Sequence, residues 1–416
     1  MTNNKIINDP VFGFIRIPNG VLYDIVVHRD FFRLSRIRQL GGAYMVYPGA
    51  QHTRFQHSLG AFYLMSKAVA TLLMKGVEIS DEEAEAVEAA ILMHDIGHGP
   101  FSHVLEHTLM SGVRHEEVSL MIMEKLNKEM DGRLSLAIQI FKDKYKKHFL
   151  HQLISSQLDM DRLDYLRRDS FFAGVTEGNI GSDRIIDMLH VKDDRLVMEK
   201  KGIYSIENYL VSRRLMYWQV YLHKTSVAAE HVLINALQRA KDLAHQGVEL
   251  FCSPALHFFL YNDVDKERFF NDPDCLTHYL NLDDNDIISA LKVWEGNDDK
   301  ILSLLSQDFI GRNIFKVEVT EGPSTKNEQE VQVIRNISER YGIDEADVKR
   351  YLTSSQMVGR DMYSTVEDKI EILMKDGTTK DISEVSDMLN VDTLSKKVRK
   401  KFFCYISFYC KFYTYF

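Results

Sequence analysis

The segment that most constrains the fold is a short helix that ends at a histidine–aspartate pair. Ser80 and Glu83 form a capping box, S-D-E-E, which predicts the first turn of an α-helix. His94 continues the apolar face of this helix, which follows at helical spacing through Ala84, Val87 and Ile91. The string G-H-G-P, which begins at Gly97, ends the helix. The chain therefore places two ionisable side chains, His94 and Asp95, at the end of an apolar helix face.

Most of residues 30–310 are predicted to form helices. The connections between the expected helices are short, and the whole chain contains only seven prolines. The longest expected helix runs from about Ile206 to about Gln246 and contains neither proline nor glycine. These observations predict a mainly α fold for the first part of the chain, residues 1–312.

The pattern changes at residue 313 and indicates a smaller α+β region, residues 313–416. Three stretches alternate like strands, 315–319, 330–334 and 369–382, and a helical stretch covers 338–352. The aromatic end of the sequence, KKFFCYISFYCKFYTYF, predicts a buried strand and a tail that packs on a neighbour. A membrane or partner anchor is the alternative. The aromatic patch also indicates a homo-oligomer, a dimer or larger.

Charge and cysteine content limit the class of protein. The net charge is -9, and an acidic chain repels nucleic-acid phosphates, so nucleic acid is not an expected partner. An anionic substrate would then need a local basic cluster. The four cysteines match no CxxC pattern, and no 18-residue apolar run or basic-then-apolar leader occurs. We therefore expect a cytoplasmic protein with reduced thiols and no membrane partner.

A dense group of histidines points to a metal. The string ILMHDIGHGPFSHVLEH holds four histidines, and His115 follows. A single histidine on an apolar helix face is most often a satisfied core residue. Here, however, Asp95 directly follows His94, and burying a carboxylate beside an imidazole is costly without a cation. A zincin site needs H-E-x-x-H on a continuous helix, which the glycines of H-D-I-G-H would disrupt.

Further ligand types lie on both sides of this group. The string HTRFQHSLG offers His52, Arg54 and His57, and the string SSQLDMDRLDYLRRD offers four aspartates. One helical stripe is expected to contain Leu150, Ile154, Leu158, Asp161 and Tyr165. Asp161 would interrupt this apolar face as His94 does, whereas Asp159 and Asp164 lie off it. We expect those two aspartates to be solvated or salt-bridged.

The order H…HD…D, within these strings, resembles the HD superfamily and, inside it, the dNTP triphosphohydrolases. The resemblance covers about residues 5–224, with the motifs in 39–224, and implies an HD-domain helical fold. It implies one divalent metal (iron, manganese, zinc or magnesium) held by His57, His94, Asp95 and Asp161. It also implies a catalytic set of Arg54, His98, His103 and His115. His115 would be the general acid, with Glu116 on its second ring nitrogen.

The resemblance further implies residues that bind substrate. Phosphate contacts would come from Arg162, Arg213 and Lys224, and the last two share one face of the long helix with Tyr217 and Tyr221. Such a stripe alone would more often be a solvated or interface face. Sugar contacts would come from Gln39, Leu40, Tyr165 and Asp169. Leu40 would crowd a 2′-hydroxyl, while Gln39 and Asp169 would bond the 3′-hydroxyl. Ordinary packing is the alternative for Leu40 and Tyr165.

The expected activity is metal-dependent hydrolysis of a dNTP at the α-phosphate. The products would be a deoxynucleoside and inorganic triphosphate. Another HD nucleotide phosphohydrolase, a nucleotidase or a phosphodiesterase, is the first alternative. A nucleotide-binding regulator without turnover is the second.

Overall fold

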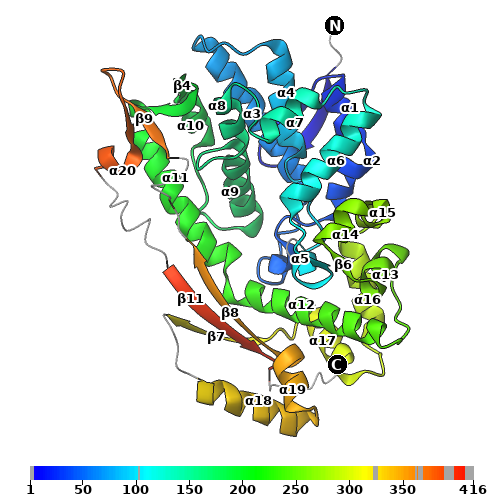
Figure 1. Cartoon of the computed structure of the whole chain (residues 1–416). Coiled ribbons are helices and arrows are strands. Elements are labelled where there is room, and N and C mark those ends of the chain that lie inside the picture. Colours follow the sequence, from blue (N-terminus) through cyan, green and yellow to red (C-terminus); the bar gives the residue numbers. More distant parts are fainter. Residues whose placement is uncertain are drawn as a thin grey trace.

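The computed structural model describes residues 4–101, 104–321, 327–360, 363, 369–387 and 398–407. Most of these residues are helical (Figure 1). The longer helices are α3 (Arg54–Met74), α4 (Asp81–Met93), α6 (His115–Glu129), α9 (Met160–Ala173), α11 (Ile203–Met216), α12 (Lys224–His245), α16 (Asp284–Trp294), α17 (Lys300–Ile310) and α18 (Asn327–Tyr341). The prediction of a mainly α fold with a smaller C-terminal α+β region is confirmed.

Shorter elements connect and cover these helices. The short helices are α1 (Val21–Val27), α2 (Arg29–Phe32), α5 (Val104–Thr108), α7 (Ser135–Phe141), α8 (His148–Ile154), α10 (Ser182–Asp187), α13 (Pro254–Tyr261), α14 (Lys266–Asn271), α15 (Pro273–Leu280), α19 (Glu345–Asp347) and α20 (Ile382–Val385). Tighter or wider turns form η1 (Arg33–Arg36), η2 (Gly41–Met45), η3 (Lys200–Gly202), η4 (Tyr217–Tyr221) and η5 (Val348–Leu352). Within the described part of the chain, no helix is long and apolar enough to cross a membrane.

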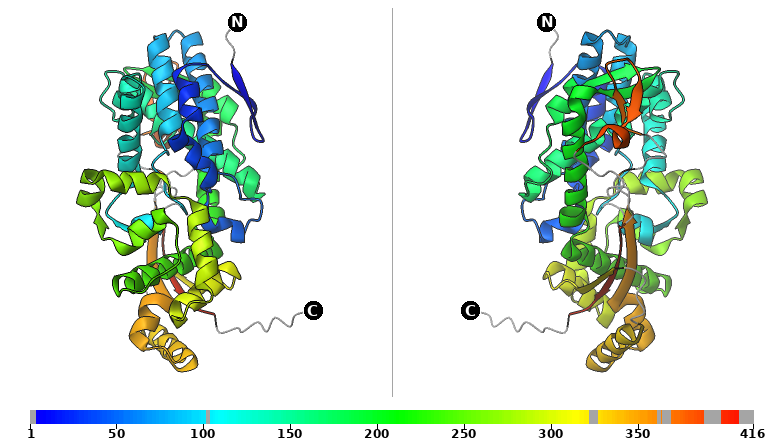
Figure 2. Two further views of the ribbon diagram at one scale, coloured as in Figure 1. Left: turned by 90° about the vertical axis from the view of Figure 1, so that its right-hand side faces the viewer. Right: turned by 90° about the vertical axis from the view of Figure 1, so that its left-hand side faces the viewer.

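In the described ranges, the strands form four small sheets. They are β1 (Lys5–Asp9), β2 (Gly13–Ile17), β3 (Met110–Ser111), β4 (Leu189–Lys192), β5 (Arg195–Glu199), β6 (Val264–Asp265), β7 (Lys316–Glu321), β8 (Thr353–Arg360), β9 (Glu371–Leu373), β10 (Thr379–Asp381) and β11 (Val398–Tyr405). The hairpin β1–β2 lies at the edge of the molecule (Figure 2), and β3 pairs with β6. The other two sheets have the orders β10-β9-β5-β4 and β7-β11-β8.

Helix α3 is the centre of the first part of the chain. Its first turn is fixed by a capping box between Thr53 and Gln56. Leu64, Met65 and Ala68 are fully buried, because α4 and α9 pack against this helix. Helix α4 begins at the predicted capping box of Ser80 and ends at Met93, so that prediction is confirmed. The packing brings the ends of α3, α4 and α9 to one place.

The single long helix predicted for residues 206–246 is wrong. Helix α11 passes into the wider turn η4, where the Leu222 amide bonds the Tyr217 carbonyl. The His223 side chain then accepts from the Thr225 amide and starts α12 afresh. The helical stripe predicted from Leu150 to Tyr165 is also wrong, because α8 ends at Ile154 and α9 begins at Met160.

The C-terminal region contains the expected strands, but two other predictions are wrong. The helix predicted over 338–352 is divided between the end of α18, α19 and η5. Residues 330–334, predicted as a strand, belong to α18, whose buried Ile337 and half-buried Val333 and Ile334 follow helical spacing. Strand β8 was not predicted. The aromatic segment does form a buried strand, β11, while residues 408–416 of the predicted tail lie outside the described residues. The domain boundary at residue 312 and the homo-oligomer stay predictions.

Candidate metal centre and adjoining cavity

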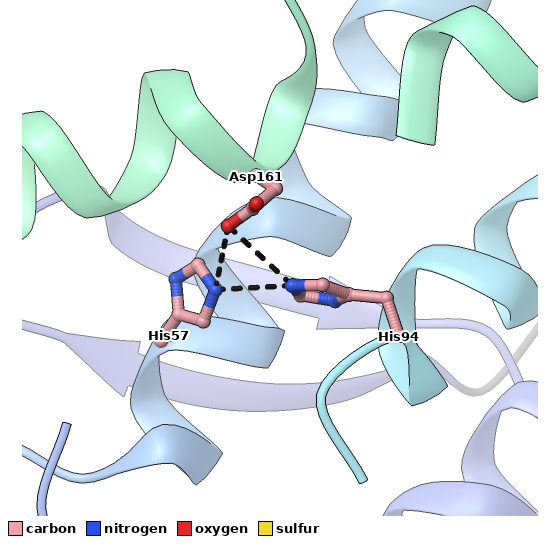
Figure 3. Close-up of side chains that lie close together, drawn as sticks. All are labelled: His57, His94 and Asp161. Atoms are coloured by element: carbon pink, nitrogen blue, oxygen red, sulfur yellow. Dashed lines mark hydrogen bonds and ion pairs between the residues drawn. The ribbon is translucent and has the colours of Figure 1, made fainter. Parts of the chain in front are cut away.

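Three predicted metal ligands converge where α3, α4 and α9 meet. His57 lies near the start of α3, His94 directly follows α4, and Asp161 lies in the first turn of α9 (Figure 3). The Nε2 atom of His57 is 3.2 Å from Nε2 of His94 and 3.1 Å from Oδ1 of Asp161. The Nε2 atom of His94 is 3.5 Å from the same oxygen. Three lone-pair atoms thus face one point, which a shared cation would satisfy.

Asp95, the fourth predicted ligand, lies beside this trio. Its Oδ1 is 3.5 Å from Nε2 of His94, and its Oδ2 is 3.8 Å from Nε2 of His57. The same Oδ2 also accepts a hydrogen bond from Arg54 at 2.6 Å. The donor set of two imidazoles and two carboxylates therefore fits a divalent metal. The Arg54 guanidinium lies at the edge of this set.

Buried partners orient both imidazoles. His57 donates from Nδ1 to Asp164 at 2.7 Å, and Nδ1 of His94 lies 2.6 Å from the Ile91 carbonyl, so both Nε2 atoms face the centre. Asp164 is fully buried and also pairs with Arg168 at 2.9 Å. Of the two expected alternatives for Asp164, solvated or salt-bridged, the structure shows the salt bridge. A Cβ at Gly60 would lie 1.9 Å from Asp164, so only glycine allows this close approach of α9 to α3.

The electrostatics of the trio are those of a cation site. Burial disfavours a charged His57 ring, but the hydrogen bonds with Asp161 and Asp164 raise its pKa to about 10. Burial opposes ionisation of Asp161, yet the hydrogen bonds to His57 and His94 hold its pKa well below the usual range. Positive charge is therefore stabilised strongly at this point.

A second group of predicted residues lies next to Asp95. The rings of His98 and His115 stack with centroids 3.8 Å apart, and Nε2 of His98 is 3.4 Å from Asp95. Burial and the Arg54 cation lower the pKa of His98 well below its usual value. Nδ1 of His115 lies 3.0 Å from Glu106, a residue that no sequence motif singles out. His103 lies outside the described residues.

Glu116, the expected partner of His115, lies beside Nε2 of the ring. Its carboxylate is 3.5 Å from Nε2 of His115, and 60% of its side chain is exposed. Glu106, which lies in α5 nine residues before His115, contacts Nδ1 instead. The difference arises because the chain between α5 and α6 folds back through β3, which separation along the sequence does not reveal.

A cavity of about 620 Å³ adjoins both groups. Its lining includes Arg54 and Glu106 together with the predicted substrate residues Gln39, Leu40, Tyr165, Asp169 and Tyr221. The buried Asp169 is held by His52 and by the Tyr221 hydroxyl, each at 2.8 Å. The structure thus brings five of the eight predicted substrate residues to one cavity.

The other three predicted substrate residues do not line this cavity. Arg162 pairs with Asp159, the N-cap of α9, which is salt-bridged as predicted. Arg213 is buried, and its Nε and Nη1 have no hydrogen-bond partner in the part of the chain that the structure describes. Lys224 is exposed in the first turn of α12. Because the long helix is broken, Arg213 and Lys224 do not share one helical face.

Comparisons with known proteins agree with this site. The HD domain profile matches residues 54–169, and the profile of the HD associated region matches residues 180–251. The crystal structure of a phosphohydrolase from Bacteroides thetaiotaomicron is 64% identical and superposes with a TM-score of 0.94, covering 97% of this chain and 99% of that chain. The chain therefore belongs to the HD-domain phosphohydrolases that carry an HD-associated region.

Two named relatives are more distant. The uncharacterized protein YwfO of Bacillus subtilis is 32% identical, over 96% of this chain and 91% of that protein. The human deoxynucleoside triphosphate triphosphohydrolase SAMHD1 is 30% identical, over 57% of this chain and 45% of that protein. The likeness to the human enzyme thus covers about half of each chain. A phosphate-containing substrate and a metal site follow from the family and the cluster, whereas the particular nucleotide does not.

Proposed function

We propose that the protein hydrolyses deoxynucleoside triphosphates at the α-phosphate and releases inorganic triphosphate. One observation carries this proposal. Arg54, which bonds the His–Asp centre, lines the same cavity as Leu40 and Asp169, the proposed sugar contacts. A cavity of about 620 Å³ is within the range usual for small-molecule sites. The partial likeness to the human triphosphohydrolase supports the same substrate class.

Metal binding is assigned to His57, His94, Asp95 and Asp161. A divalent metal held there would polarise a phosphoryl oxygen and make a water molecule more acidic. The chain itself fixes the ligand directions, because Asp164 and the Ile91 carbonyl hold the far nitrogens of the two imidazoles. The metal is iron, manganese, zinc or magnesium in this proposal.

Cationic side chains would hold the triphosphate. Arg54 lies between the metal centre and the cavity and would stabilise charge on the reacting phosphate. Arg213 carries unpartnered, buried guanidinium nitrogens in the described part of the chain, and an unpaired buried cation is costly unless an anion joins it. Arg162, Lys224 and the histidines His98 and His103 would complete the phosphate contacts.

His115 is the proposed general acid. Glu106 accepts a hydrogen bond at Nδ1, so Nε2 is the nitrogen that can deliver a proton from the charged ring. The proton would pass to the leaving 5′ oxygen as the bond between that oxygen and the α-phosphorus breaks. Water supplies the oxygen that remains on the triphosphate.

The sugar would be read by Leu40, Gln39 and Asp169, with Tyr165 and Tyr221 as further contacts. All five line the cavity. The carboxylate of Asp169 is held by two hydrogen bonds and is thus positioned to accept from a 3′-hydroxyl. Leu40 is an apolar wall that offers nothing to a 2′-hydroxyl, which favours a deoxyribose.

Product analysis tests the proposal. Metal-loaded protein would be incubated with dNTPs and NTPs in H₂¹⁸O, and the products separated by ion chromatography. We expect deoxynucleoside and triphosphate in equal amounts, with the label in triphosphate. The Asp95→Ala variant serves as the inactive control. Orthophosphate or a nucleoside monophosphate as the first product would instead support a nucleotidase or phosphodiesterase, and no product would support a non-catalytic regulator.

A further inference from the structure

One wall of the cavity comes from the C-terminal region. Gln356 of β8 lines the cavity together with Ser226, Glu230 and Leu233 of α12. Helix α12 crosses between the sheet β7-β11-β8 and the helices of the HD domain (Figure 1). The cavity is therefore shared between the HD domain, the helix that follows it and a strand from the end of the chain.

Two side chains of α12 hold β8 at this wall. Asn235 is buried and donates to the Tyr351 carbonyl of η5 at 2.7 Å and to the Thr353 carbonyl of β8 at 3.4 Å. One helical turn earlier, the buried His231 contacts β8 through both ring nitrogens. Its Nδ1 lies 2.9 Å from the Ser354 hydroxyl, and its Nε2 lies 3.2 Å from Oε1 of Gln356. Strand and helix are thus joined by polar contacts within a few residues of the cavity.

The Gln356 carboxamide turns its oxygen toward His231. A carboxamide oxygen can only accept, so Nε2 of His231 carries the proton and donates to Oε1. The neutral ring then accepts at Nδ1 from the Ser354 hydroxyl. With its oxygen engaged, Gln356 can offer only its amide N–H groups to a ligand. No residue in the described ranges accepts from that nitrogen, and none pairs with the buried Ser226 hydroxyl on the same cavity wall.

We propose that Gln356, held by His231, reads the nucleobase as a hydrogen-bond donor. The inference rests on the proposed dNTP hydrolysis. That proposal assigns the triphosphate and the sugar to other residues, so the nucleobase is the part of the substrate that would contact the wall formed by β8 and α12. Guanine and thymine present a carbonyl oxygen where adenine and cytosine present an amino group. A donor at Gln356 therefore favours guanine and thymine. Gln356 is a specificity residue, and His231 is its positioning residue.

Steady-state kinetics with the full-length metal-loaded protein test the inference. The measured quantities are the kcat/KM ratios of dGTP to dATP and of dTTP to dCTP. We expect both ratios to exceed one by about two- to tenfold, the usual range for one hydrogen bond. Gln356→Leu should bring both ratios close to one. Gln356→Glu, which replaces the donor by an acceptor, should invert them toward dATP and dCTP, a gain that a misfolded protein could not show.

Matched variants separate positioning from folding. Ser355→Ala alters the exposed neighbour on the opposite side of β8 and should leave both ratios unchanged. His231→Asn should lower the ratios through looser placement of Gln356, with metal content unchanged. Calorimetric binding of the four free deoxynucleosides gives the same comparison without turnover.

The outcomes distinguish the two proposals. If the parent releases triphosphate but Gln356→Glu leaves the kcat/KM ratios unchanged, base reading by Gln356 is overturned and dNTP hydrolysis stands. If the parent releases no triphosphate and binds the four deoxynucleosides equally, both proposals fall. If it releases no triphosphate but binds deoxyguanosine better than deoxyadenosine, and this preference inverts in Gln356→Glu, only the assigned reaction fails.

Discussion

His57 donates from Nδ1 to the fully buried carboxylate of Asp164 at 2.7 Å. The bond leaves Nε2, which faces His94 and Asp161, as the ring nitrogen that can bind a metal. Asp164 is held in turn by Arg168, whose guanidinium also binds Asp9 at 2.7 Å. The direction of a proposed metal ligand is thus set by a buried chain of charges from α9 to the N-terminal hairpin.

Asp164→Asn should weaken metal binding by about 10- to 100-fold, the usual effect of losing a carboxylate behind a ligating histidine. The affinity would be measured by competition with a chelator. Asp9→Asn is the matched control, because it removes a carboxylate from the same arginine without touching His57. Equal losses in both variants would mean that Asp164 acts through Arg168 and folding alone.

Asp95 and Arg54 form an ion pair, and their substitutions should have different effects. Asp95→Ala should abolish both metal content and turnover, since it removes a proposed ligand. Arg54→Gln should retain stoichiometric metal, which plasma mass spectrometry would measure. Its kcat should fall, because the arginine that stabilises the charge on the reacting phosphate is lost. Metal retained in Asp95→Ala would remove Asp95 from the ligand set.

His115→Ala should retain its metal and bind nucleotide nearly normally. Its kcat should fall by about 10²–10⁴, the usual contribution of a positioned general acid. Glu106→Gln should lower kcat in the same direction, because Glu106 contacts Nδ1, whereas the exposed Glu116 should tolerate Gln. The reverse order of these two glutamate variants would contradict the assigned partner of His115.

Leu40→Ala should relax the choice of sugar. Removal of the apolar wall makes room for a 2′-hydroxyl, so the kcat/KM of an NTP should rise relative to that of the matching dNTP. Leu40→Ile keeps the volume and should keep the ratio. An unchanged ratio in Leu40→Ala would show that Leu40 packs in the fold and does not select the sugar.

Asp308 in α17 should make stability depend on pH. Burial raises its pKa to about 7, and its Oδ2 has no partner among the residues described. In the unfolded chain the value is about 3.9, so the folded state binds more protons between about pH 4 and pH 7. Stability is therefore lost as pH rises through this window. Asp308→Asn should raise the unfolding free energy at pH 8, by at most about 4 kcal/mol, and change it little at pH 4.

Thermal unfolding of Asp308→Asn at both pH values checks this prediction. Asp298→Asn, at an exposed position near α17, is the control and should shift the melting temperature at neither pH. A stabilisation of equal size at pH 4 and pH 8 would show that the carboxylate charge is not the cause.

Local signals in the sequence were sufficient for several parts of the fold. The capping box at Ser80 and the end of α4 depend on residues within one or two turns, so a single sequence contains them. The order of the His and Asp motifs carried the family resemblance, and that resemblance grouped His57, His94, Asp95 and Asp161, which do lie together. Pairings such as that of Met357 in β8 with Lys401 in β11 depend on distant residues, so β8 had no local signal.

Helix breaks explain the remaining differences at the site. The expected stripe from Leu150 assumed one helix, but the interruption at residues 155–159 resets the helical phase. Asp164 therefore faces His57 rather than solvent. Similarly, no glycine or proline marks the break after Tyr221, where the Tyr221 hydroxyl donates to Asp169 of α9, a residue far away along the chain.

Strand β11 lies between β7 and β8, although it is the last of the three along the chain. During synthesis, β7 and β8 must wait for residues 398–405 to leave the ribosome before either gains its partner. The side chains of His57, His94 and Asp161 all come from residues up to α9. A nascent chain therefore contains every side chain of this cluster well before the strand that bears Gln356 gains its partner in the sheet.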